Sequence, residues 1–344
     1  MLIESGADVH AKTKDSWWTP GHMAASNGKR NCLELLIKAG IDVNAKAGPR
    51  LTSTLLHEAS HCGFVDCIEL LLDSGADATL YDNKDLAIHT VCRLGYSDCL
   101  ELLLKHYQSI NRADLMNAYT NVDKQEDRIH YLTALHMAAV SNQTECVQML
   151  LKYNCKHLPT GLGHYPLVLA SLKMNIDCLR VLLKSDNDTK HSSNTAFTPL
   201  HFLCTKTYKT TEKCVAVACL LLNWGVDINH CNPHISNWET CLSISSRNGA
   251  MGLVNFLLES GANPHMSDDL DKRSKNFPNV RRCWDAIQDA RDAPQSLRIQ
   301  CRKAVRKWLG VGKIHKIYDM ELPRVIQNYV FHGHFLRGNM CDPL

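Results

Sequence analysis

The chain has 344 residues, which is long enough for one extended repeat array or for two to three globular domains. Its 45% content of hydrophobic residues is ordinary for a folded protein, and a formal net charge of +3 is too small to favour nucleic acid as a partner. No apolar run approaches the ~18 residues of a membrane helix, so we expect no membrane-spanning segment.

Sixteen cysteines would indicate disulfides in a short secreted chain, but Met1–His10 lacks the basic segment and the apolar run of a secretory signal. We therefore expect a cytoplasmic protein, with the nucleus as a second location, whose thiols are reduced. The charge is uneven, because residues 265–344 hold 15 Lys and Arg against 9 Asp and Glu. The end of the chain is thus basic, whereas the part before it is slightly acidic.

A period close to 33 residues begins near the N-terminus. Thr19–Ala25 (TPGHMAA) precedes a Leu-rich stretch at 32–36 and a Gly-containing loop at 40–44. Related starts recur at Thr54–His57, Leu86–His89, Thr133–Ala139, Tyr165–Val168, Thr198–His201 and Thr240–Ser243. This pattern resembles the ankyrin-repeat family, in which T-P-L-H-x-A opens the first of two helices. The resemblance implies an all-α solenoid of helix pairs with short β-hairpins, one partial plus seven repeats, over residues 1–264.

Several segments depart from the period. Residues 1–12 resemble only the end of a repeat, so we expect an exposed apolar edge near residue 20. The interval from His89 to His136 is too long, which predicts a polar surface loop over Tyr107–His130, and a shorter insertion lies at Lys206–Lys213. Residues 265–293 predict a capping linker in which Cys283–Arg291 forms a short helix closing the stack.

Five histidines share one repeat position: His22, His57, His89, His136 and His201. They could form a metal row, but packed helices lie about 8–10 Å apart, too far for several of these side chains to reach one ion at about 2 Å. The family resemblance implies instead that this histidine bonds backbone between repeats. We expect no metal site.

Cysteines also recur, three residues before each Leu-rich triplet, at Cys32, Cys67, Cys99, Cys146 and Cys178. The two later repeats have Val217 and Leu253 there, which indicates a buried apolar slot in which a free cysteine fits. Disulfides along this stripe would need Cα atoms within about 7 Å, which the repeat spacing forbids.

Tryptophans stand out at the expected hairpins. Trp17 and Trp238 occupy positions where an ankyrin hairpin usually has its turn glycine, and Trp18 is an ordinary hairpin residue. Tryptophan is enriched in binding hot spots, so the three are candidate substrate-binding residues. The alternative is that they pack on the neighbouring hairpin.

Sequence motifs of the common enzyme classes are absent. The chain has no G-x-S-x-G, no P-loop, no G-x-G-x-x-G and no H-E-x-x-H. We therefore expect no catalytic residues, no cofactor and no enzymatic activity.

The segment after the repeats predicts an amphipathic helix. Leu297, Cys301, Val305 and Trp308 fall on one stripe of a 3.6-residue period. Lys and Arg side chains occupy the opposite face. That basic face could be a nuclear-import or nucleic-acid patch, but the solvated face of an amphipathic helix accounts for it as well.

Two motifs in this segment resemble the SOCS box. Ser296-Leu297-x-x-x-Cys301-x-x-x-Val305 is similar to its elongin-binding box, and 320–330 (MELPRVIQNYV) is similar to its cullin box. By this resemblance Leu297, Cys301, Val305 and Trp308 bind elongin C. By the same resemblance the cullin-binding residues are Leu322, Pro323, Ile326 and Tyr329. Met320 and Glu321 replace the family's Leu-Pro.

Ankyrin repeats followed by a three-helix SOCS box, here 294–340, identify the chain as resembling the ankyrin repeat and SOCS box family. The resemblance implies a substrate receptor of a ubiquitin ligase that assembles with elongin B, elongin C, a RING subunit and a cullin, with cullin-5 as the expected one. The protein substrate stays unidentified. A scaffold or adaptor that binds partners without promoting ubiquitination is the alternative, and Met320-Glu321 favours it.

Overall fold

Four of the described helices begin at a cap with the sequence pattern Thr-x-x-His. The structure is a computed structural model that describes residues 3–48, 53–82, 85–120, 131–185, 197–206, 212–231, 239–266, 277–292, 299–300 and 304–305. At Thr19, Thr54, Thr133 and Thr198 the side-chain oxygen lies 2.8–2.9 Å from Nδ1 of the histidine three residues later. The backbone N–H of each threonine donates to the same nitrogen. This reciprocal pairing satisfies groups that the first helical turn leaves open.

The chain divides into two units, Met1–Leu162 and Gly163–Leu344, each built from helix pairs. The helices of the first unit are α1 (Pro20–Ser26), α2 (Arg30–Lys38), α3 (Leu55–Cys62), α4 (Val65–Asp73), α5 (Ala87–Leu94), α6 (Ser97–Ser109), the 3-10 helix η1 (Ala113–Asn117), α7 (Ala134–Val140) and α8 (Thr144–Lys152). Those of the second unit are α9 (Pro166–Lys173), α10 (Ile176–Ser185), α11 (Pro199–Lys206), α12 (Glu212–Asn223), α13 (Cys241–Arg247), α14 (Met251–Ser260), the 3-10 helix η3 (Pro264–Met266) and α16 (Pro278–Asp292).

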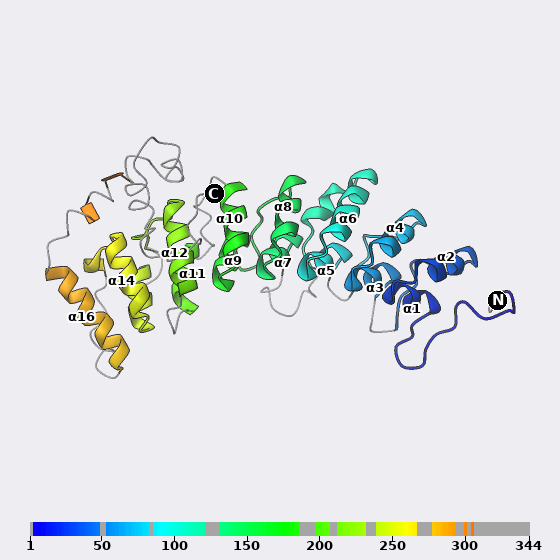
Figure 1. Cartoon of the computed structure of the whole chain (residues 1–344), viewed down its shortest axis with the longest axis horizontal. Coiled ribbons are helices and arrows are strands. Elements are labelled where there is room, and N and C mark those ends of the chain that lie inside the picture. The colour runs from blue at the N-terminus through cyan, green and yellow to red at the C-terminus, as the bar shows by residue number, and fades with distance from the viewer. Residues whose placement is uncertain are drawn as a thin grey trace. The chain divides into compact units, whose positions relative to one another are not determined.

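Within each unit the helices pack in two rows. In the first unit α1, α3, α5 and α7 form one row and α2, α4, α6 and α8 the other, each helix contacting the next in its row (Figure 1). In the second unit α9, α11 and α13 form one row and α10, α12 and α14 the other. The core lies between the rows, where leucines such as Leu71, Leu103 and Leu182 are buried. The predicted all-α stack of helix pairs is confirmed.

The predicted β-hairpins are reduced to single bridges among the described residues. Backbone pairs join Lys46 to Thr54, Asp82 to Asp85, and Tyr119 to Thr133. Each bridge brings the loop that ends one repeat to the cap that starts the next helix. One bridged residue pair is enough to reverse the chain direction, because the next helix packs directly on the first helix of the preceding pair.

The long interval before His136 is only partly a surface loop. Residues 121–130 lie outside the described residues, but Tyr107 is fully buried at the end of α6 and donates a hydrogen bond to the carbonyl of Ala78 at 3.0 Å. Leu115 and Met116 of η1 are buried too. The prediction of a polar surface loop over Tyr107–His130 is therefore wrong at Tyr107, Leu115 and Met116, although residues 108–114 between them are exposed. An aromatic ring large enough to cover the neighbouring hairpin extends the packed structure there.

A closing helix covers the last pair of the second unit. The predicted helix at Cys283–Arg291 is confirmed, but α16 begins earlier, at Pro278, because proline fits the first turn of a helix. It contacts α13 and α14, and its side chains Val280, Cys283 and Ile287 are buried. Nε of Arg291 donates to the carbonyl of Pro264 at 2.9 Å, which fixes the end of the helix against η3.

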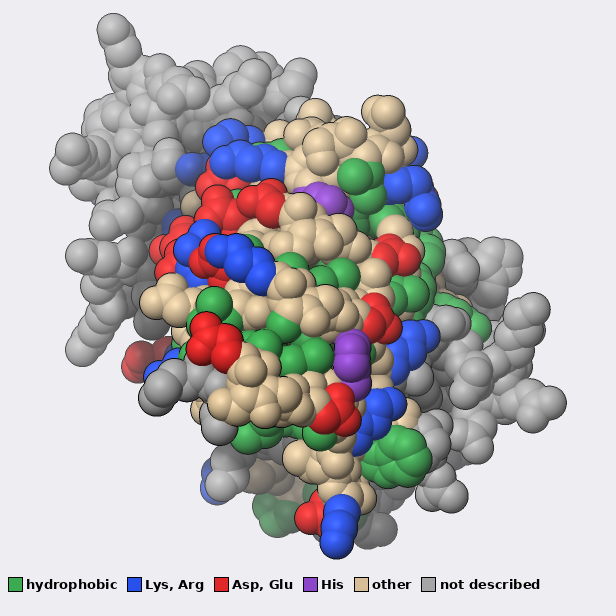
Figure 2. Space-filling view, turned by 90° about the vertical axis from the view of Figure 1, so that its right-hand side faces the viewer, with side chains coloured by type: hydrophobic (Ala, Val, Ile, Leu, Met, Phe, Trp, Pro, Cys, Tyr) green, Lys and Arg blue, Asp and Glu red, His purple; other side chains and the backbone are tan. Residues whose placement is uncertain are grey.

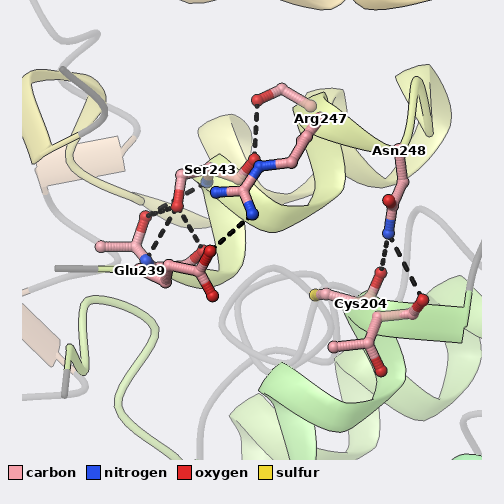
Figure 3. Close-up of polar contacts among 8 residues, drawn as sticks. Cys204, Glu239, Ser243, Arg247 and Asn248 are labelled. Atoms are coloured by element: carbon pink, nitrogen blue, oxygen red, sulfur yellow. Dashed lines mark hydrogen bonds and ion pairs between the residues drawn. The ribbon is translucent and has the colours of Figure 1, made fainter. Parts of the chain in front are cut away.

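The pair α13–α14 keeps the cap without the histidine. Ser243 stands at the histidine position, and its N–H and hydroxyl both bond groups of Thr240 (Figure 3). Nδ2 of Asn248 donates to the carbonyl of Cys204 at 2.8 Å, which joins the end of α13 to α11. Arg247 forms an ion pair with Glu239 just before the cap. Ser243 thus takes over the local capping bonds of the histidine, and Asn248 adds a bond to the preceding repeat.

Three of the five shared histidines join consecutive repeats, as predicted, whereas Nε2 of His57 is buried without a hydrogen-bond partner. Nε2 of His22 lies 3.3 Å from the carbonyl of Ser53, that of His89 2.9 Å from Ala118, and that of His201 3.1 Å from His230. Because Nδ1 accepts from a backbone N–H, the proton sits on Nε2, which donates to the next repeat's carbonyl. Burial lowers the pKa of His89 and of His201 to about 4 in each case. These rings are therefore neutral crosslinks between repeats.

Glycines between the two helices of a pair accept an aromatic ring from the next repeat. A Cβ at Gly63, whose φ is +75°, would lie 2.8 Å from the ring of Tyr96, and one at Gly28 would lie 2.6 Å from Phe64. Gly75 has a similar φ of +87° but nothing within 4 Å of a Cβ. Comparing substitutions at Gly63 and Gly75 therefore separates the cost of backbone strain from the cost of a clash with the aromatic ring.

We predict that Gly63→Ala destabilises the first unit more than Gly75→Ala. Both variants place alanine at a positive φ, which costs about 1 kcal/mol. Only Gly63→Ala also drives a methyl group into the Tyr96 ring, for a further ~1–3 kcal/mol. Urea unfolding of the two variants measures the difference, and equal free energies of unfolding would contradict the stacking role of Gly63.

We predict that acidification destabilises the repeats through these histidines. The folded pKa of His89 is about 4 against 6.5 unfolded, so its contribution is complete above pH 6.5 and is lost as the pH falls to about 4. At pH 4 the loss amounts to about 3 kcal/mol. His89→Gln should lower stability at pH 7 yet show a smaller drop between pH 7 and pH 4.5 in urea titrations. An unchanged pH dependence in this variant would rule out His89 as a source.

Candidate partner-binding surfaces

The predicted elongin- and cullin-binding residues fall almost entirely outside the described part of the chain. Val305 is described, as a helical residue of intermediate exposure next to Ala304. The others lie outside the described residues: Leu297, Cys301, Trp308, Leu322, Pro323, Ile326 and Tyr329. Their roles therefore stay predictions from the sequence.

Two of the three candidate tryptophans are described, whereas Trp238 lies outside the described residues. Trp17 has a φ of +58°, an uncommon conformation for a bulky side chain, and it stays 47% exposed. Nζ of Lys12 lies 5.6 Å from the centre of its ring. Trp18 stacks on His22 with ring centroids 6.2 Å apart. Trp18 thus packs within its own repeat, while Trp17 presents its ring to solvent beside a lysine.

An open apolar groove crosses α1 and α2 and confirms the predicted apolar edge near residue 20. Its volume is about 1270 Å³, and apolar atoms supply most of its lining. Met23 of α1 and Leu35 of α2 line it and are 49% and 58% exposed. Figure 2 views the end of the first unit that carries α1 and α2, where hydrophobic side chains lie open between charged ones.

Met23 and Leu35 are absent from the site residues predicted from the sequence. Both occupy ordinary positions of the repeat, so the sequence pattern around them predicts buried core residues. The signal that could have found them is the partial repeat over residues 1–12, which lacks helices to cover this face.

The cysteine stripe is buried except at its first member. Cys67, Cys99, Cys146 and Cys178 are at most 1% exposed, and burial raises the pKa of Cys99 to about 11. Cys32 is exposed, so the prediction of a buried slot is wrong at that position. The reason is that this slot faces the preceding helix pair, and among the described residues no helix precedes α1. Cys32 instead lines the groove.

Carboxylates gather around one histidine in the first unit. Nε2 of His57 is buried without a hydrogen-bond partner, and burial lowers the pKa of this ring while Asp82 and Asp85 oppose that shift. Burial raises the pKa of Glu58 and of Asp85. Among the described residues no group of three His, Cys, Asp or Glu side chains is arranged to hold a metal ion. We therefore interpret this cluster as a structural contact between the His57 ring and the hairpin loop that carries Asp82 and Asp85.

None of the described helices is both long and apolar enough to cross a bilayer.

Comparison with known proteins identifies the repeats. A family model of three ankyrin repeats matches residues 1–82, 22–114, 80–160, 112–194 and 135–232. Ankyrin repeat and SOCS box protein 9 of Mus musculus is 29% identical over 112 residues, covering 33% of this chain and 37% of that protein. Ankyrin repeat and SOCS box protein 11 of Mus musculus is 26% identical over 157 residues, 45% of each chain.

A solved structure shows the same fold. The crystal structure of the human ASB11 ankyrin repeat domain matches with a TM-score of 0.53 at 23% identity, covering 70% of this chain and 97% of that one. The sequence alignments span less than half the length of the curated relatives named above. The chain belongs to the ankyrin-repeat family and is homologous to several ankyrin repeat and SOCS box proteins.

Proposed function

We propose that this protein is the substrate-recognition subunit of an elongin B/C–cullin-RING ubiquitin ligase, with cullin-5 as its cullin. The ankyrin repeats bind the protein substrate, and residues 294–340 recruit the ligase. The observation that carries the proposal is the homology of the repeats to several ankyrin repeat and SOCS box proteins in a chain whose sequence continues into both SOCS-like motifs.

The order of the segments supports this assignment. Helix α16 packs on α13 and α14. The elongin-box pattern Ser296–Val305 follows it within a few residues. A helix that carries Leu297, Cys301 and Val305 on one stripe can insert that stripe into a partner's groove, with Leu297 as the main anchor. Cys301 is small enough to allow close approach of the two helices.

The chain itself performs no bond chemistry in this proposal. It supplies proximity, because binding a substrate and a ligase at once raises the effective concentration of substrate lysines near the loaded conjugating enzyme. This role requires a rigid repeat surface, which neighbour packing provides, and a separate recruiting segment. A scaffold that binds partners without ubiquitination is the second candidate, and the Met320-Glu321 departure in the cullin-like motif favours it.

We predict that Leu297→Glu with Cys301→Arg abolishes co-purification with elongin B and C. Loss of a buried anchor costs about 2–4 kcal/mol, which weakens binding roughly 30- to 1000-fold. Lys303→Glu, on the opposite face of the same predicted helix, is the matched control and should retain binding. Thermal unfolding should show unchanged repeats in both variants. Equal elongin binding by the wild type and the double variant would refute the elongin assignment.

We predict that Ile326→Asp with Tyr329→Asp removes the cullin while elongin B and C stay bound. The two substituted residues lie on one face of the predicted cullin motif, and charge there prevents an apolar contact. The measurement is the subunit content of the purified complex and its ability to build ubiquitin chains in vitro. A wild-type complex that holds elongins but neither binds a cullin nor builds chains would favour the scaffold.

A further inference from the structure

Two repeat positions next to the shared histidines carry a charge in one repeat only. The residue directly after the histidine is Glu58 in α3, whereas the other four repeats with this histidine have Met23, Thr90, Met137 and Phe202. The residue four positions before the histidine is Asp85 ahead of α5, whereas the others are Trp18, Ser53, Leu132 and Phe197. The repeat frame thus requires no charge at either position, and these two carboxylates need another explanation.

The side chains of Glu58, Asp82 and Asp85 form an acidic niche where α3 meets the loop before α5. Asp82 and Asp85 exchange backbone hydrogen bonds of 2.8 and 2.9 Å across that loop. Burial, and then the charge of Asp82, raises the pKa of the Glu58 carboxyl. Oε1 of Glu58 accepts a hydrogen bond from Oγ of Ser53 at 2.6 Å, which orients the side chain. All three acidic residues are half-buried, so a ligand can reach them from solvent.

The buried ring of His57 lacks, at this same place, the bond that other shared histidines make. His57 is 4% exposed, and its Nδ1 accepts from the backbone N–H of Thr54, so Nε2 carries the proton. Nε2 has no hydrogen-bond partner, although the carbonyls of Leu80 and Asp85 in the next loop face it. An unpaired buried donor costs free energy. The loop is therefore held short of the position that completes this bond.

Repulsion within the niche accounts for that gap, and a cation would remove it. Glu58 lies on α3 while Asp82 lies on the loop, so their like charges oppose the approach of the two elements. Arg93 lowers the pKa of Asp85 and His61 that of Glu58, but burial outweighs both, and both cations are exposed. A positive group bound between α3 and the loop attracts carboxylates on both sides.

The chemistry of the niche selects an arginine side chain. Among the described residues no group of His, Cys, Asp or Glu is arranged to hold a metal ion, and three carboxylates repel an anion such as nucleic acid. A guanidinium presents donors in a planar fork, so it can bond carboxylates on two elements at once. Leu132 and Met137, at the corresponding positions of the α7 repeat, are half-buried and apolar, which suits the continuation of a peptide.

We propose that the acidic niche binds an arginine side chain of the protein substrate. The guanidinium lies between Glu58 on one side and Asp82 and Asp85 on the other, and it draws the loop toward α3 so that His57 gains its missing bond. The segment that carries the arginine continues across Leu132 and Met137. This inference rests on the proposed function, because it names the kind of substrate that the ankyrin repeats take.

A phage-displayed library of random peptides tests the niche on the full chain. The wild type should select peptides with a recurrent arginine, whereas Glu58→Gln with Asp85→Asn should lose that preference. Asp66→Asn with Asp98→Asn is the matched control, because it removes the same charge from exposed positions in the first turns of α4 and α6. No recurrent arginine with the wild type, or an unchanged preference in the Glu58–Asp85 variant, would overturn the proposal.

A selected peptide then measures the contribution of the positive charge. Citrulline in place of its arginine keeps the shape of the side chain and removes the charge. The citrulline peptide should bind about tenfold more weakly in fluorescence anisotropy, because charge-assisted hydrogen bonds are lost. Added salt should weaken the arginine peptide more than the citrulline peptide. Equal affinities of the two peptides would overturn the proposal.

Arg93→Gln distinguishes a binding site from a structural cluster. Loss of this exposed cation near Asp85 should tighten the arginine peptide about threefold, since it competes for the same carboxylate. Unchanged or weaker binding would contradict the niche. The Glu58–Asp85 variant should unfold at the urea concentration of the wild type or above, because the substitutions relieve repulsion between buried like charges.

Peptide binding and elongin binding can fail independently. Glu58→Gln with Asp85→Asn should co-purify with elongin B and C as the wild type does. Leu297→Glu with Cys301→Arg should bind the arginine peptide with wild-type affinity. A failed peptide test therefore removes the niche and leaves the ligase role, whereas a chain that binds the peptide but not the elongins refutes the ligase role and leaves the niche.

Discussion

Every helix pair in this protein depends on its neighbour. A pair such as α3–α4 has helices of eight and nine residues, too short to be stable alone in water. Its apolar face becomes buried only when the adjacent pairs stack against it. The neutral histidines reinforce this contact, because a ring such as His89 accepts a bond within its own cap and donates one to the next repeat. Packing and hydrogen bonding thus act across the same boundary.

The parts of the fold set by local chemistry could be predicted from the sequence. Thr19 and His22 fix a helix start through contacts three residues apart, and the Leu-rich stretches fix the second helices, so the repeat period follows directly. The wrong predictions concern residues whose burial depends on parts of the chain distant in sequence. Cys32 has a local sequence context similar to that of Cys67, but among the described residues no helix pair covers it. The sequence predicts that Tyr107 starts a polar loop. Its ring is buried instead, and its hydroxyl donates to the carbonyl of Ala78 in the preceding repeat.

The candidate sites also differ in whether a local sequence pattern or the packing of distant segments defines them. The elongin-like motif is a short helical pattern, so Leu297 and Cys301 can be named from the sequence, although Val305 is the only one of its motif-defining residues that the structure describes. The α1–α2 groove depends on which side chains remain uncovered after stacking, and no local pattern around Leu35 reveals that. Motifs that bind through their own residues can be predicted from sequence, whereas surfaces left open by packing require coordinates.

The one-sided contact of the first helix pair also bears on how the first unit opens. Among the described helices α1–α2 packs against α3–α4, whereas α3–α4 packs against both α1–α2 and α5–α6. In a stack whose stability is a sum over neighbouring interfaces, an end pair can fray while the pairs behind it stay folded. Amide protection should therefore rise stepwise from α1 to α5.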